Sequence, residues 1–200
     1  LATEYGKNLF VINCADNTVV KTLPCTAASV VMAKDGSLWV STTEGISRFN
    51  AETLDLEPLT LGEGIGLPVL TSGAWNPDCF CASLQSNVIY WASSTEWTIN
   101  KVFKYDIDKQ EASLFIDYTT DADGRALYGA ALSVDPKTDC IYTSLVKGWT
   151  FNDNVVRKYS ADGTQLAEYT MEANYWFPEM FVFPDTEDPV LADFKAINLG

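Results

Sequence analysis

Residues 131–171 read ALSVDPKTDCIYTSLVKGWTFNDNVVRKYSADGTQLAEYTM, and this stretch decides the fold. It holds four short runs rich in Val, Ile, Leu and Tyr, separated by turns of Asp, Gly, Thr and Pro. Such a pattern predicts strands that are joined by hairpins. Four antiparallel strands in about 40 residues are the size of one blade of a β-propeller.

The same unit recurs along the chain, at approximately residues 26–61, 69–117 and 130–171. The two ends complement each other, because residues 177–197 match the first two strands of the unit and residues 8–23 match the last two. A propeller commonly closes its ring by building one blade from both termini, which leaves no exposed sheet edge. The sequence therefore predicts an all-β propeller of four-stranded antiparallel blades, either a closed four-bladed ring or part of a seven- or eight-bladed one.

Composition narrows the classes of function. The chain of 200 residues is 47% hydrophobic, enough for a packed core, and its formal net charge is −14. Nucleic acids and anionic membranes bind clustered Lys and Arg, so this charge argues against both as partners. No apolar run reaches the roughly 18 to 20 residues of a membrane-spanning helix, so we expect no membrane span. The chain has no initiator Met and no signal-like segment, and we expect it to come from a longer or processed precursor.

Histidine is absent. Its absence removes Ser-His-Asp and Cys-His catalysis and the commonest ligand for zinc, copper and iron. The five cysteines have no metal-like spacing, and we expect them to be free and buried. The turn at residues 121–124 resembles the start of a calcium loop but lacks the third acidic ligand and the closing Glu. We therefore predict no catalytic residues, no metal and no cofactor.

Residues 10–20, FVINCADNTVV, resemble the repeat of YncE-like, surface-layer-type β-propellers, which typically reads Val-Ile-Asp-x-x-Thr-x-x-Val-Val. Segments 73–76 with 90–91, and 176–178 with 182–185, look like an extracellular or lipid-anchored branch of that family in anaerobic gut bacteria. Some members of that branch capture cobalamin at the cell surface. The resemblance implies a propeller fold, an extracellular or cell-surface location and a corrinoid as one candidate ligand. It carries no ligand-binding residue over to this chain, and it departs in length, since such propellers usually have seven or eight blades.

Aromatic residues fall into two groups. Those inside predicted strands are expected to pack between blades: Trp39, Trp75, Tyr90, Trp91, Tyr105, Tyr142 and Tyr159. Within the pair Tyr90–Trp91, the alternation of a strand sends one ring to each side of its sheet. The other group lies in connections, where no turn geometry requires a large ring.

Blade geometry sorts the connections onto two faces. The turns between strands one and two and between strands three and four are short and acidic, and we interpret them as solvated turns. The opposite face has longer connections with aromatic residues, which dominate recognition surfaces on rigid scaffolds. An alternative is that each of these aromatics only caps the space between blades. The predicted ligand-binding residues are Trp97, Arg125, Tyr128, Trp149, Phe151, Tyr175 and Trp176.

These observations favour a non-enzymatic, exported binding propeller at the cell surface. Its aromatic face would hold a small molecule, such as a corrinoid or a glycan, or a partner protein. One alternative is a hydrolase or lyase that uses carboxylates and a divalent cation, since Glu96, Asp153 and Glu172 are expected on the same face. A second alternative is a structural or adhesive module with no small ligand.

Overall fold

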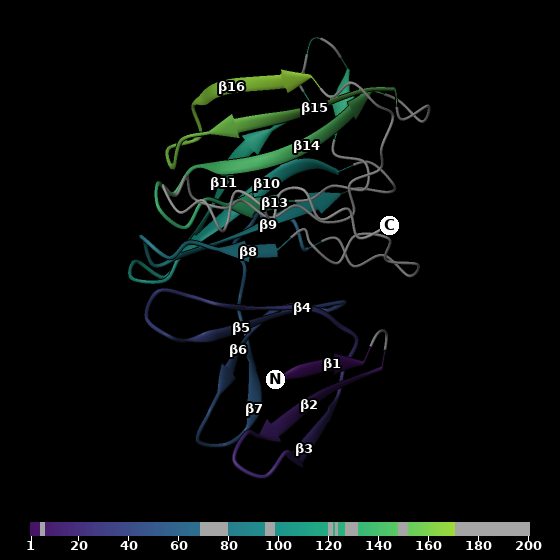
Figure 1. Cartoon of the computed structure of the whole chain (residues 1–200), viewed down its shortest axis with the longest axis vertical. Coiled ribbons are helices and arrows are strands. Elements are labelled where there is room, and N and C mark those ends of the chain that lie inside the picture. The colour runs from purple at the N-terminus through teal and green to yellow at the C-terminus, as the bar shows by residue number, and fades with distance from the viewer. Residues whose placement is uncertain are drawn as a thin grey trace, which may run out of the picture.

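The computed structural model describes residues 1–4, 7–68, 80–94, 99–119, 122, 124–126, 132–147 and 152–170. These residues form strands and turns, with no helix among them. The strands make antiparallel sheets that follow one another along the chain (Figure 1), and we name these sheets A to D. The predicted all-β class, with blades of four antiparallel strands, is confirmed.

Most strands are three to eight residues long and alternate with short turns. Sheet A holds β1 (Ala2–Glu4), β2 (Asn8–Asn13) and β3 (Thr18–Pro24). Sheet B holds β4 (Ala27–Met32), β5 (Leu38–Thr42), β6 (Gly45–Asn50) and β7 (Asp55–Pro58). Sheet C holds β8 (Phe80–Ala82), β9 (Val88–Ser94), β10 (Ile99–Asp106) and β11 (Glu111–Asp117). Sheet D holds β12 (Arg125–Ala126), β13 (Leu132–Val134), β14 (Ile141–Lys147), β15 (Asn152–Tyr159) and β16 (Gln165–Thr170).

The sheets are arranged like propeller blades. In sheets B and C each strand pairs with its neighbour in sequence, and sheet D follows the same path with the short strand β12 added beside β14. The first strands of these three sheets lie side by side, because β4 contacts β8 and β8 contacts β13. In sheet A, β1 contacts β4. Figure 1 shows sheet A at the bottom of the molecule and sheet D at the top, with sheets B and C between them.

Sheet A contains a strand that the sequence pattern did not predict. β1 pairs antiparallel with β2, from Ala2 opposite Phe10 to Glu4 opposite Asn8. The sequence pattern instead predicts that a strand from residues 177–197 lies beside β2 and completes this blade. Residues 177–197 lie outside the described residues, so the sharing of this blade stays a prediction.

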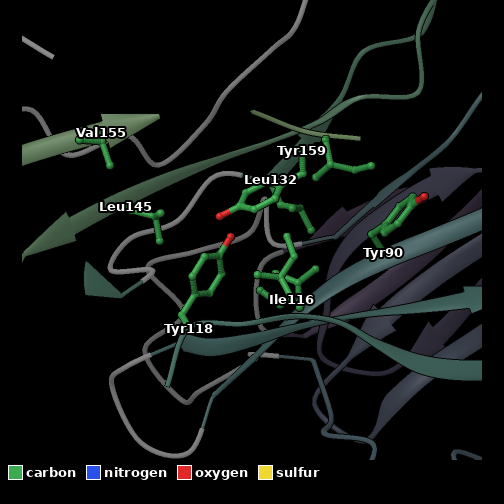
Figure 2. Packing of buried hydrophobic residues seen from close by; sticks show 10 residues of the cluster. Tyr90, Ile116, Tyr118, Leu132, Leu145, Val155 and Tyr159 are labelled. Carbon is green, nitrogen blue, oxygen red and sulfur yellow. The ribbon is translucent and has the colours of Figure 1, made fainter. Parts of the chain in front are cut away.

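Each pair of neighbouring sheets encloses its own hydrophobic cluster. Leu9 and Val40 form the centre of the cluster between sheets A and B. The cluster between sheets B and C includes Trp39, Trp91 and Tyr105, and the cluster between sheets C and D includes Tyr90 and Tyr159. Figure 2 shows the cluster between sheets C and D, with Tyr90 at one edge and Val155 at the other. Trp91 and Tyr90 thus point to opposite sides of sheet C, as the strand alternation predicted.

One described aromatic residue of the predicted core, Tyr142, does not join the cluster between sheets C and D. Tyr142 is only half-buried, and it lies on the face of sheet D that points away from sheet C. The Lys158 ammonium lies 5.5 Å from the centre of its ring. Its neighbours in β14, Ile141 and Thr143, point inward and are fully buried. Alternation along the strand therefore places Tyr142 on the opposite face. Trp75 lies outside the described residues.

The segment that joins sheets B and C packs directly on sheet C. The Trp91 Nε1 donates a hydrogen bond of 2.8 Å to the carbonyl oxygen of Gly66. Leu59, Leu61 and Ile65 pack against the same cluster. A Cβ at Gly66 would overlap the Ser93 Oγ, lie 2.9 Å from the Ser93 Cβ and lie 3.1 Å from Phe103. Only a glycine fits this approach without movement of the sheet.

We therefore expect Gly66→Ala to lower the free energy of unfolding by about 1–3 kcal/mol, as overpacking does in a filled core. The check is chemical denaturation of Gly66→Ala, Ser93→Gly and the double variant. Removal of the Ser93 side chain creates the missing space, so the double variant should recover part of the loss. Additive losses in the double variant would contradict this explanation.

Candidate functional site

The strands of sheets B, C and D terminate at two opposite ends, which we name the turn end and the loop end. The turn end holds the hairpin turns between first and second strands and between third and fourth strands. The loop end holds the junctions between second and third strands. Figure 1 shows the short turns of these sheets together at the left, with the arrowhead of β14 at the right. The loop end is the face to which the sequence assigned the binding residues.

One predicted binding residue lies in the described part of the chain. Arg125 begins β12, and its backbone pairs with Lys147 at the last residue of β14. Arg125 is therefore at the loop end, beside the junction between β14 and β15. The other predicted binding residues lie outside the described residues: Trp97, Tyr128, Trp149, Phe151, Tyr175 and Trp176.

The anchor points of two aromatic connections are well defined. Ser94 pairs with Ile99 across β9 and β10, and Lys147 pairs with Asn152 across β14 and β15. Both pairs are at the loop end of neighbouring sheets, which enclose one hydrophobic cluster. Segments 95–98 and 148–151 start and finish at these pairs. Of the carboxylates considered for catalysis, Asp153 lies in β15, while Glu96 and Glu172 lie outside the described residues.

The turn end is more than a set of solvated turns, because its side chains join each sheet to the next. Lys21 of sheet A donates to Asp55 of sheet B at 2.7 Å. Lys34 of sheet B donates to the carbonyl oxygen of Gln85 in sheet C, also at 2.7 Å. The Gln85 side-chain nitrogen then donates to the carbonyl oxygen of Pro136 in sheet D at 2.7 Å. Hydrogen bonds of the turns therefore connect neighbouring blades at this end.

Asp139 is the central acceptor between sheets C and D. The hydroxyl groups of Ser83 and Ser86 both donate to its carboxylate, the second at 2.7 Å. Ser83 and Asp139 are buried, with exposed fractions of 0% and 8%. Asp139 has a φ of 61°, the left-handed region that Asp and Asn tolerate better than most residues. The sequence pattern marked residues 135–139 only as a turn and missed this buried contact.

A groove of about 510 Å³ opens at the turn end between sheets B and C. Its sides come from the β4–β5 turn, the β8–β9 turn and the β10–β11 turn. The Asn87 side-chain nitrogen donates to Asp108 at 2.9 Å, whereas its side-chain oxygen is buried and has no hydrogen-bond partner. The lining residues are Lys34, Asp35, Gln85, Ser86, Asn87, Val88, Asp106 and Asp108.

Two of the groove carboxyls are held in the ionised form. Burial by itself would raise the pKa of Asp35, but hydrogen bonds from Ser37 and Asn87, with a smaller effect of the Arg48 charge, hold that pKa below its ordinary value. The hydrogen bond from Lys109 lowers the pKa of Asp106, and the two side chains are 2.6 Å apart. Both carboxyls are therefore negatively charged at neutral pH.

Polar groups at the cluster between sheets C and D have hydrogen-bond or ion-pair partners inside the protein. The Tyr118 hydroxyl lies 3.0 Å from the Thr143 hydroxyl, and Figure 2 shows it pointing toward Tyr159. Burial raises the pKa of Tyr118 well above its ordinary value. The buried Arg157 pairs through Nε with Glu168 at 2.7 Å. The Tyr118 contact joins sheet C to sheet D, whereas the Arg157–Glu168 pair joins β15 to β16 within sheet D.

The described residues contain no group of three or more His, Cys, Asp or Glu side chains that could hold a metal ion. Four of the cysteines lie in the described residues. Their predicted burial is wrong, because Cys14 is exposed and the others are only half-buried: Cys25, Cys81 and Cys140. Cys14 lies in the exposed turn between β2 and β3. Over the same part of the chain, no helix is long and apolar enough to cross a membrane.

Solved structures share the fold. The extracellular domain of BT4673 from B. thetaiotaomicron, a propeller-like protein, matches with a TM-score of 0.53 at 11% identity, over 82% of this chain and 20% of that one. A TolB-like protein from Agrobacterium tumefaciens matches with a TM-score of 0.46 at 17% identity, over 74% of this chain and 49% of that one. A puromycin hydrolase matches with a TM-score of 0.46 at 15% identity, over 76% and 23%. The chain thus spans less than half the length of each.

Sequence comparison gives a family and no characterised relative. No curated protein matches the chain significantly. The family model described as "Domain of unknown function (DUF5074)" matches residues 1–184. This match covers nearly the whole chain, and the chain therefore belongs to the DUF5074 family.

Proposed function

We propose that this chain is an exported, non-enzymatic binding module that holds its ligand at the loop end. The observation that carries the proposal is the position of the strand ends Ser94, Ile99, Lys147 and Asn152 and of Arg125. All of them lie at one end of two sheets that share a packed cluster. The segments between these ends carry Trp97, Trp149 and Phe151. Binding residues are commonly presented by loops on such a rigid scaffold.

The ligand class follows from the residue types. Aromatic rings offer large apolar faces with few rotatable bonds, and Arg125 adds a cationic donor. A flat polycyclic molecule such as a corrinoid, or a sugar ring, suits such a surface. A partner protein with a complementary apolar patch is the third possibility, since aromatic and Arg residues dominate protein interfaces. The resemblance to cobalamin-capturing surface propellers supports the corrinoid among these.

Export is the second part of the proposal. The likeness to BT4673 concerns an extracellular domain, and this supports a location outside the cytoplasm. The net charge of −14 is compatible with that location and keeps the module soluble. Fractionation of the native host, with detection of the protein by antibody, tests this part. Recovery only in the cytoplasmic fraction would reject it.

The binding proposal is tested with the triple variant Trp97→Ala, Trp149→Ala, Trp176→Ala. Cyanocobalamin and a glycan array serve as probes, and calorimetry measures the affinity for whichever probe binds. We expect the triple variant to bind at least about tenfold more weakly, because such anchors carry much of the binding energy. Tyr169→Ala is the matched control, since Tyr169 is an exposed aromatic residue of β16. Unchanged affinity in the triple variant would reject the loop end as the site.

A further inference from the structure

Sheet D has a side that no described sheet covers. Sheet C packs on one side of it, and Figure 1 shows sheet D at the top of the array, with no labelled sheet beyond it. Tyr142, Val156 and Lys158 alternate along β14 and β15 with residues that point toward sheet C, so they lie on the other side. We name the surface that these three residues form the far side of sheet D.

The far side repeats a pattern that the other sheets use for packing. Each of sheets B, C and D has an aromatic residue in its second strand directly opposite a basic residue in its third: Trp39 and Arg48, Tyr90 and Lys104, and Tyr142 and Lys158. Trp39 is 3% exposed in the cluster between sheets B and C, and Tyr90 is 1% exposed in the cluster between sheets C and D. In both cases the next sheet along the chain buries the ring. Tyr142 has the same position in sheet D, so its ring points to the place of a further sheet.

The turn end of sheet D indicates the same place. The Lys34 side chain of sheet B donates to the first turn of sheet C, and the Gln85 side chain of that turn donates to the first turn of sheet D. A backbone hydrogen bond of the same span closes both of these turns, over residues 83–88 and 135–140. Lys137 therefore has the position in sheet D that Gln85 has in sheet C, and it is exposed. Its ammonium is placed to donate to the first turn of a further sheet.

The chain itself contains a segment that fits this place. The fourth strands of sheets B and C lead into the next sheet, and β16, the fourth strand of sheet D, is followed by residues 171–200. Within these, residues 179–194 read EMFVFPDTEDPVLADF, two apolar runs around a turn of Pro, Asp, Thr and Glu. This is the pattern of a first and a second strand. The segment has five acidic residues and no basic one, which complements Lys137 and Lys158.

We propose that the far side of sheet D is a docking surface for residues 179–194 of the same chain, which add a strand pair beyond it. Tyr142 packs under this pair, and Lys137 donates to its turn. The other place predicted for this segment, beside β2 in sheet A, fits less well because β1 is already paired there. Figure 1 shows sheets A and D at opposite ends of the array, so the segment serves only one of them.

This placement has a consequence for the loop end. β16 ends at Thr170, which pairs with Val155 near the start of β15, so the chain leaves sheet D at the loop end. A first strand that begins at residue 179 and runs toward the turn end also starts at the loop end. Both ends of residues 171–178, which carry Tyr175 and Trp176, are then fixed there. The docking itself requires no ligand, so its test is separate from that of the proposed function.

Photocrosslinking of the full chain tests the proposal. The photoreactive residue p-benzoylphenylalanine replaces Tyr142 in one variant and Lys137 in a second, where the exposed turn accepts a bulky side chain. In a third variant it replaces Phe10 of β2, near the alternative place in sheet A. Mixing isotope-labelled with unlabelled chains separates cross-links within one chain from those between copies. Mass spectrometry of the digested products identifies the linked peptides.

The expected main product from the Tyr142 and Lys137 positions is a cross-link to residues 177–197 of the same chain. Hydrogen exchange of residues 179–194 should also become at least about tenfold faster in Tyr142→Ala, because the ring no longer holds the strand pair. Leu114→Ala, at an exposed position of β11, is the control and should leave this exchange unchanged. Three results would overturn the proposal: cross-links to a second copy, cross-links to residues 177–197 from the Phe10 position instead, or none to these residues from either position on sheet D.

Discussion

Trp91→Ala is expected to lower the free energy of unfolding by about 3–5 kcal/mol, the usual range for removal of a large buried aromatic side chain. Trp91 is fully buried between sheets B and C, and its ring stacks on Phe103 with 5.9 Å between the ring centres. The variant also leaves the carbonyl oxygen of Gly66 without its donor. In a chain of this length the loss corresponds to a fall in Tm of roughly 6–20 °C.

Thermal and chemical denaturation, followed by circular dichroism, measure this loss. Trp91→Phe keeps most of the ring but loses the hydrogen bond to Gly66, so it should be destabilised by a smaller amount. Tyr169→Ala, at an exposed position of β16, should change stability little. If Trp91→Ala and Tyr169→Ala were equally stable, the described packing between sheets B and C would be wrong.

Asp139→Ala is expected to have the second largest effect, a loss of about 3 kcal/mol. Two hydroxyl groups of sheet C donate to this carboxylate, and hydrogen bonds to a charged partner contribute about 1.5–3 kcal/mol. The substitution also places alanine at a φ of 61°, a backbone conformation that alanine tolerates less well than aspartate does. The loss should appear as lower resistance to urea.

Two companion variants separate these causes. Asp139→Gly accepts the left-handed backbone but has no acceptor, so its loss should come from the contact with sheet C alone. Asp139→Asn keeps an acceptor and tolerates the backbone, so it should lose least. Equal stability of Asp139→Gly and the unmodified protein would show that the contacts of Ser83 and Ser86 contribute nothing. The three variants are compared by urea midpoints at one pH.

The strand pattern was predictable because it is local. Alternating runs such as residues 155–159, with turns such as 161–164, specify hairpins through neighbours in sequence, and hairpins make up most of this fold. β1 was missed because three residues, Ala2 to Glu4, carry no alternation that distinguishes them from a loop. Their strand state depends on pairing with β2, which is a tertiary effect.

Strand order determines which end of a sheet a residue lies at, whereas the contacts between turns depend on how neighbouring blades pack. Arg125 was assigned to the loop end from strand order alone, and its backbone lies there. The contact of Ser83 with Asp139 joins residues 56 positions apart, and no pattern within either turn indicates it. The same holds for Asn87 and the groove, which exists only because turns of two blades meet. The turns are specified locally in the sequence, whereas their partners in the next blade are not.

The adjacent side chains of Tyr90 and Trp91 have a consequence for how the protein unfolds. A single strand, β9, supplies one large ring to each of two clusters. Detaching sheet C would therefore expose apolar surface on both of its neighbours at the same time. Where each unit gains its stability from contacts with the next, partly opened states are rare and melting spreads through the array. Hydrogen exchange of amides in β5, β9 and β14 should accordingly report one common opening event.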